Sequence, residues 1–265
     1  MPIDFKGSSL TTYRWGQPDK PPLLLLHGGL AHSIWYQALA PLLATHYYVV
    51  ACDLPGHGHS TWLDAYTMEA FDQALQAMLQ CFFTPPIIIS HSFSAKLTPY
   101  LYANHVDRIR GAILLDPPPL TFTQLQNERR RTIKYYSDRD TLMQRFRIIP
   151  PQPEVGDRQL LQSVAKHSIT HTQSGYRWCF DPNFWFKLQI KYEKPPQTLP
   201  HQRYALIAGE HSLVATQTVI HDYAEHIPGL SIMQLKNAYH ALMLDNPKEL
   251  HTLILQGIHD MNLNQ

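Results

Sequence analysis

The residues 87–94, which read Ile-Ile-Ile-Ser-His-Ser-Phe-Ser, decide the fold. The apolar run from Pro86 to Ser90 predicts a buried strand, and residues 95–104 predict a helix directly behind it. A helix that follows a strand so closely requires a sharp turn between them. This turn lifts its central side chain, Ser92, above the sheet at the positive end of the helix. Ser90 and Ser94 stand where glycine is common, so this motif alone is as compatible with an ordinary turn as with a nucleophile.

The alternation of strand and helix extends to both sides of this turn. Apolar runs of five or six residues predict strands at 22–26, 47–52, 111–115, 204–208 and 231–235. Helix-length segments lie between them, at 34–43, 68–82 and 216–226, and a last helix follows Asn246 as cap and Pro247 at its first position. The expected fold class is α/β, with a doubly wound, mostly parallel sheet that is buried on both faces.

Residues 120–200 interrupt this rhythm. They contain no run typical of a parallel strand, and they carry a cluster of aromatic side chains: Tyr176, Trp178, Phe180, Phe184, Trp185 and Phe186. We expect a mostly helical cap here, so that the core comprises 1–119 and 201–265 and the cap 120–200. The aromatic cluster is expected to pack the cap and to line the cleft beneath it.

The turn His27-Gly28-Gly29-Leu30 follows an earlier strand. A glycine-rich turn at that place can point a backbone N–H, from Gly29 or Leu30, at a developing negative charge. The second N–H would come from Phe93, the residue after Ser92. A plain tight turn explains the same residues equally well.

Histidine is abundant, with 16 residues, so position must select among them. His240 has the best placement for a general base, because it lies in a loop after the last predicted strand and shortly before the final helix. His27, His57 and His59 lie in turns, and the backbone geometry of those turns is a sufficient explanation for their presence. His91 neighbours Ser92 but is expected to point away from it on such an elbow.

Composition excludes several classes of protein. The chain of 265 residues has a net charge of +1, which gives no electrostatic footprint for nucleic acid or an anionic membrane. Three scattered cysteines favour neither a disulfide framework nor a metal site, and no organic cofactor is implied. Residues 1–17 lack the pattern of a secretory signal, and no aliphatic run is long enough to cross a bilayer. We expect a cytoplasmic protein.

Together these motifs resemble the α/β-hydrolase fold superfamily. The resemblance rests on the Leu-His-Gly-Gly loop, the turn at 53–60, the Ser92 elbow, and His240 followed by Asp245-Asn246-Pro247, which occur in the superfamily's order. It implies a serine hydrolase with Ser92 as nucleophile and His240 as base. It also implies that Asp53 is structural.

The acid of the expected triad departs from the family pattern. Relatives usually carry an aspartate three residues after the glycine that ends the next-to-last strand, but here Gly209 is followed by Glu210, His211 and Ser212. Asp116, at the end of the sixth strand, is our preferred acid because some superfamily members place theirs there. Glu210 is the alternative. Two further readings stay open: that Asp116 only caps the insertion before three prolines, or that the enzyme works with a weakened dyad.

The resulting hypothesis is hydrolysis of a small carboxylic ester, thioester or lactone through an acyl-enzyme. The aromatic cap suggests that the substrate is apolar. The substrate is expected to be the main partner, with no nucleic acid or membrane, and a homodimer is left open. Two alternatives remain: a non-catalytic binding protein on the same fold, favoured by the missing acid and elbow glycines, and a carbon–carbon bond hydrolase.

Overall fold

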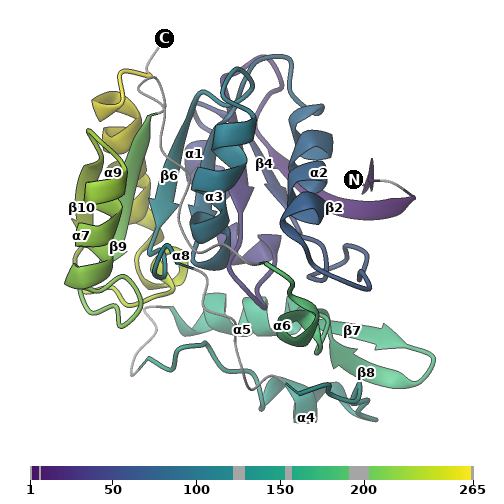
Figure 1. Ribbon diagram of the computed structural model, residues 1–265. Coiled ribbons are helices and arrows are strands. Elements are labelled where there is room, and N and C mark those ends of the chain that lie inside the picture. The colour runs from purple at the N-terminus through teal and green to yellow at the C-terminus, as the bar shows by residue number, and fades with distance from the viewer. Residues whose placement is uncertain (1, 6, 122–128, 153–156, 191–202, 264–265) are drawn as a thin grey trace.

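An eight-stranded sheet forms the centre of the computed structural model, which describes residues 2–5, 7–121, 129–152, 157–190 and 203–263 (Figure 1). The strand order is β1-β2-β4-β3-β5-β6-β9-β10. Neighbours from β4 to β10 pair in parallel, whereas β2 pairs antiparallel with both β1 and β4. The strands are β1 (Pro2–Phe5), β2 (Ser8–Trp15), β3 (Pro22–Leu26), β4 (Tyr48–Cys52), β5 (Ile87–His91), β6 (Gly111–Leu115), β9 (Tyr204–Gly209) and β10 (Ser231–Leu235).

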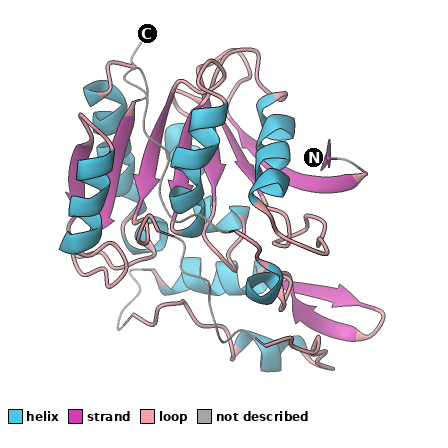
Figure 2. Ribbon diagram, viewed as in Figure 1, coloured by secondary structure: helices cyan, strands magenta, loops and turns pink. Residues whose placement is uncertain are grey.

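The parallel strands from β4 to β9 in the sheet order are buried along their whole length because both faces of the sheet are covered. In β3, Leu24 and Leu26 belong to one core cluster, and Leu23 and Leu25 belong to the other. Helices α2 (Met68–Leu79), α3 (Phe93–Asn104) and α7 (Gln217–His226) pack on the first face. Helices α1 (Ala40–Leu43), α8 (Leu242–Asp245) and α9 (Pro247–Asp260) contribute to the second cluster, and Figure 2 shows the two helical layers. The predicted doubly wound architecture is confirmed.

The predicted core strands lie within one residue of the observed ones, but one predicted helix was wrong and two strands were missed. The helix expected at 34–43 is split into a short 3-10 helix (Ser33–Tyr36) and α1, because Pro41 has no N–H to continue the helical ladder. The N-terminal strands β1 and β2 were not predicted. In β2 only Leu10 and Thr12 are buried, so its apolar signal is weak.

The cap lies across the ends of the sheet strands and is not purely helical (Figure 1). The cap contains helices α4 (Arg139–Met143), α5 (Arg158–His167) and α6 (Phe184–Lys187). An antiparallel hairpin of β7 (Ile169–Thr172) and β8 (Gly175–Trp178) lies between α5 and α6. The expectation of a mostly helical cap missed this hairpin. In the part of the chain that the structure describes, no helix is long and apolar enough to cross a membrane.

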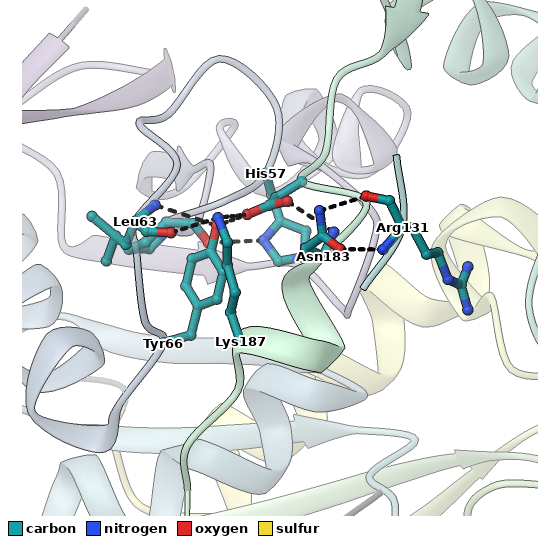
Figure 3. A network of polar contacts seen from close by, with 8 residues as sticks. His57, Leu63, Tyr66, Arg131, Asn183 and Lys187 are labelled. Atoms are coloured by element: carbon teal, nitrogen blue, oxygen red, sulfur yellow. Dashed lines mark hydrogen bonds and ion pairs between the residues drawn. The ribbon is translucent and has the colours of Figure 1, made fainter. Parts of the chain in front are cut away.

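A network of polar contacts that includes Tyr66, Asn183 and Lys187 ties the cap to the core (Figure 3). Asp181, which is 1% exposed, accepts hydrogen bonds through Oδ2 from the Tyr66 hydroxyl and from Lys187 Nζ, both at 2.8 Å. Its backbone N–H donates to Gly56 O (2.8 Å), and its Oδ1 accepts from the Asn183 N–H (2.8 Å). The charge of Asp181 is therefore compensated on all sides, and the cap segment that carries α6 is fixed against the core.

Candidate active site

Ser92 occupies the strained turn that the sequence predicted. It lies between β5 and α3 with φ 52° and ψ −116°, a conformation that L-residues rarely adopt and that costs about 1–3 kcal/mol. The serines that replace the usual glycines are integrated by hydrogen bonds. Ser94 Oγ donates to Leu26 O (2.8 Å), and Ser90 Oγ accepts from the Thr98 hydroxyl (2.8 Å). Both flanking serines are buried, so their small polar side chains fit the elbow without unpaired groups.

His240 connects Ser92 to a carboxylate. Its Nε2 lies 2.9 Å from Ser92 Oγ, and its Nδ1 lies 2.6 Å from Asp116 Oδ2. A carboxylate at Nδ1 requires the proton on that nitrogen, which leaves the lone pair of Nε2 facing the serine hydroxyl. The structure thus brings together the three side chains that the sequence analysis selected, in the geometry of a general-base relay.

Asp116 is completely buried at the end of β6, with a positive φ of 46°. Its Oδ1 accepts from the Gly209 N–H (2.9 Å), and its Oδ2 accepts from both His240 and the Ser212 hydroxyl (2.5 Å). Ser212, at the position where the sequence pattern led us to expect an acid, instead donates a hydrogen bond to Asp116 on the neighbouring strand end. Three donors satisfy this buried carboxylate.

Glu210, the alternative acid, lies elsewhere. Its carboxylate accepts from the Asn237 N–H (2.9 Å) and from Lys236 Nζ (3.2 Å) on the surface. These hydrogen bonds lower the pKa of Glu210. No contact joins it to His240 within the described residues, so the geometry favours Asp116.

The glycine-rich loop after β3 lies against Ser92. Ala31 N donates to Gly28 O (3.3 Å), which forms a turn that leaves the N–H groups of Gly29 and Leu30 without an acceptor inside it. A Cβ on Gly28 would lie 2.8 Å from His91 Nδ1 and 3.1 Å from Ser92 Cβ, so only glycine permits this approach. Phe93, at the first position of α3, has a backbone N–H with no acceptor within the helix.

His91 does not merely point away, as the sequence analysis expected. Its Nε2 hydrogen-bonds to the backbone oxygen of His240 (2.8 Å), and the two rings lie 4.7 Å apart. Burial is the main reason that the pKa of His91 lies well below its usual value, so the ring is neutral and donates from Nε2. His91 thereby fixes the loop that carries His240. The signal that could have found it is its position beside the elbow.

Asp53 and His27 form hydrogen bonds to the backbone of neighbouring loops. Asp53 accepts from the N–H groups of Ser33 (2.8 Å) and His59 (3.0 Å). His27 Nε2 accepts from the Leu54 N–H (2.9 Å), which joins the glycine-rich loop to the following turn.

Two cavities flank this centre. The oxyanion-side cavity, of about 320 Å³, is lined by Gly29 and Leu30 together with Trp35, Phe146, Trp178 and Phe180. The histidine-side cavity, of about 200 Å³, is lined by His240, Tyr239, His211, Leu213 and the cap residues 150–152. Consecutive cap residues separate the two, since Ile149 lines the first and Pro150 the second.

The aromatic cluster has the double role that the sequence suggested. Trp178 and Phe180 line the oxyanion-side cavity, whereas Phe184 is fully buried among core aromatic rings. Trp185 covers the glycine-rich loop so closely that a Cβ on Gly29 would lie 2.7 Å from its ring. Phe186, in contrast, is half exposed.

No group of three metal-ligating side chains is found among the described residues. The three cysteines are free, and burial raises the pKa values of Cys52 and Cys179. The polar side chains that meet at this centre are the Ser92 hydroxyl, the His240 imidazole and the Asp116 carboxylate.

Fold and site together define a class of protein, and comparison with known proteins names it. The model of the alpha/beta hydrolase family matches residues 23–253, and the chain belongs to this family. The curated relatives include the lipase LipV of Mycobacterium tuberculosis, 33% identical over 110 residues that cover 41% of each chain. They also include (E)-2-((N-methylformamido)methylene)succinate hydrolase of Acinetobacter baylyi, 28% identical over 42% of this chain and 43% of that protein. The chain therefore matches less than half the length of these relatives.

The fold of this chain matches that of a solved structure over nearly the whole length of both chains. The thioesterase domain from the curacin biosynthetic pathway superposes with a TM-score of 0.79 at 22% identity, covering 96% of this chain and 98% of that one. This likeness establishes the fold, and the predicted family is confirmed.

Proposed function

We propose that this protein is a serine hydrolase that cleaves a small carboxylic ester, thioester or lactone through an acyl-enzyme. The observation that carries the proposal is the relay from Ser92 Oγ through His240 to Asp116, with contacts of 2.9 and 2.6 Å. Membership of a family whose named relatives include a lipase supports the same class of reaction.

Acylation begins when Ser92 Oγ attacks the carbonyl carbon and His240 Nε2 takes the hydroxyl proton. The carbonyl oxygen becomes an oxyanion, and the imidazolium is stabilised by the carboxylate of Asp116. Collapse of this intermediate breaks the bond to the leaving group, which receives the proton from Nε2. Water then repeats the sequence on the acyl-enzyme and releases the acid. General acid–base catalysis of this kind contributes on the order of 10²–10⁴ in rate.

The oxyanion is assigned to backbone donors. Phe93 N–H is one, and Gly29 or Leu30 supplies the other. Removing a single oxyanion donor from a hydrolase costs about 10²–10³ in kcat. The closeness of Trp185 to Gly29 supports a water-poor site, in which such donors act strongly.

The features that favoured a non-catalytic binding protein have local explanations that support catalysis instead. Asp116 supplies the carboxylate that position 212 lacks, and Ser212 donates to it. Ser90 and Ser94 take part in the elbow's own hydrogen bonds. Each departure from the family pattern therefore coexists with intact geometry at Ser92.

A fluorophosphonate probe tests the proposal, because it reacts covalently only with an activated serine. We expect wild-type protein to be labelled and Ser92→Ala to be unlabelled, with Ser231→Ala, a serine on β10 outside the site, labelled like wild type. Absence of labelling in folded wild type, or equal labelling of Ser92→Ala, would contradict the proposal. A screen of esters, thioesters and lactones, with Ser92→Ala as blank, then identifies the preferred bond.

A further inference from the structure

The nearly neutral chain conceals a strong asymmetry of charge. Residues 120–200 contain 13 of the 22 Lys and Arg residues but only 7 of the 21 Asp and Glu residues. The cap segment is therefore basic, and the rest of the chain is acidic. Such a local excess of positive charge attracts anions toward the surface that carries it.

Two of these cations line the oxyanion-side cavity, namely Arg145 and Arg147. Arg147 Nη1 donates to the backbone oxygens of Gln144 and Phe146, both at 2.7 Å, and the Arg145 guanidinium lies 5.5 Å from the centre of the Tyr136 ring. Neither forms an ion pair with a carboxylate within the described residues. The cavity next to the oxyanion loop thus has positive charge that the described part of the protein does not neutralise.

A buried donor in the same cavity wall also lacks a partner in the described part of the chain. Trp35 lines this cavity and is 8% exposed, and its indole N–H has no acceptor among the described residues. A buried N–H is ordinarily hydrogen-bonded, so an orphaned one beside a cavity suggests an acceptor that binds there. An anionic oxygen satisfies both this donor and the arginines.

The positions of the two cavities relative to His240 indicate where each half of an ester substrate binds. His240 returns its proton to the leaving group, so the leaving group departs on the side of the histidine-side cavity. The acyl part then enters the oxyanion-side cavity, whose walls include Trp178, Phe180 and Phe146. At about 320 Å³ this cavity is at the small end of ligand pockets, which favours a short acyl chain.

We propose that the acyl part of the substrate ends in a carboxylate, so that the preferred substrates are monoesters of short dicarboxylic acids. The methylene chain packs on the aromatic walls, Arg145 and Arg147 pair with the terminal carboxylate, and the Trp35 N–H provides a further donor. Arginine suits this task because its planar fork matches a carboxylate. This inference rests on the proposed function and narrows its substrate class.

Two esters of equal chain length test it: mono-p-nitrophenyl glutarate and p-nitrophenyl pentanoate. We expect wild type to favour the glutarate ester by about tenfold in kcat/KM, a modest factor because exposed charge pairs are weak. In the double variant Arg145→Gln/Arg147→Gln, the ratio of the two kcat/KM values should fall about tenfold. Arg158→Gln, which removes a cap arginine outside the cavity, should leave the ratio unchanged.

Three outcomes would overturn the proposal. They are equal cleavage of both esters by wild type, an unchanged ratio in the double variant, and a loss of ratio in Arg158→Gln as large as in the double variant. The last result would indicate long-range attraction instead of a binding site. Failure of the proposed function looks different, because then neither ester is cleaved and Ser92 is not labelled by the fluorophosphonate.

Discussion

Replacing Asp116 with asparagine isolates the contribution of the acid. The side chain keeps its shape, and an amide oxygen can still accept from the Gly209 N–H, as Asp116 Oδ1 does at 2.9 Å. An NH₂ group then replaces the oxygen that faces His240 Nδ1 at 2.6 Å. Because that group donates, it favours the imidazole tautomer with its proton on Nε2, which cannot accept the proton of Ser92.

The expected loss in kcat is about 10⁴-fold, as for other hydrolases whose histidine is held in the wrong tautomer. This corresponds to about 5.4 kcal/mol of transition-state stabilisation, at 1.36 kcal/mol for each factor of ten. The assay is the release of p-nitrophenol from a short-chain ester, with circular dichroism to establish that the variant is folded. Glu210→Gln is the matched control and should retain kcat within about twofold.

A second substitution sharpens the test. Ser212 Oγ already lies 2.5 Å from Asp116 Oδ2, so a carboxylate at position 212 comes close to His240 Nδ1. Asp116→Asn/Ser212→Asp should therefore recover about 10- to 100-fold of the activity lost in Asp116→Asn. If Asp116→Asn has nearly wild-type kcat, or if the large loss occurs in Glu210→Gln instead, the assignment of the acid is wrong.

Three further predictions follow from packing and burial. Gly29→Ala should lower kcat at least tenfold, because its Cβ would lie 2.7 Å from the Trp185 ring, and Trp185→Ala in the same chain should restore part of it. Asp181→Asn should lower the free energy of unfolding by about 2 kcal/mol, measured in urea, because a buried carboxylate loses charge-assisted hydrogen bonds. The free energy of unfolding should also fall steeply from pH 6.5 toward pH 4, and His27→Gln should reduce that slope.

The sign of the pH effect follows from the buried histidines. Burial lowers the pKa of His27 to about 4 and those of His32 and His57 to about 3. Below pH 6.5 each of these histidines binds a proton in the unfolded chain but stays neutral in the folded protein. The free energy of unfolding therefore falls by up to about 1.4 kcal/mol per pH unit for each residue as the pH decreases. Urea midpoints that do not change between pH 7 and pH 5 would contradict this prediction. A Gly29→Ala variant with wild-type kcat would contradict the first prediction. An Asp181→Asn variant with the wild-type urea midpoint would contradict the second.

The sequence predicted the core well because its signals are local. Strands buried on both faces are apolar without interruption, which is why β3 and β6 could be placed to the residue. Ser92 and His240 followed from their places at the ends of strands. The alternating pattern of β2 was too weak, since this strand is only partly buried.

From the sequence, the acid of the triad could be assigned only to one of two residues, Asp116 or Glu210, because the deciding contacts are long-range. Asp116 and Gly209 are 93 positions apart, and they meet because β6 and β9 are neighbours in the sheet. Nothing in the local sequence reveals that the hydroxyl of Ser212 points at the carboxylate of Asp116. The contact between Trp185 and the glycine-rich loop also depends on long-range packing.

The cap segment at Ile149 and Pro150, which divides the two cavities, has a consequence for selectivity. If the acyl part and the leaving group occupy separate compartments, a change in one half of the substrate leaves the surroundings of the other half unaltered. Free-energy contributions from independent sites add. The factors by which the acyl part and the alcohol part change kcat/KM should then multiply when a set of acyl groups is combined with a set of alcohols. Each compartment can therefore be redesigned without changing the preference of the other.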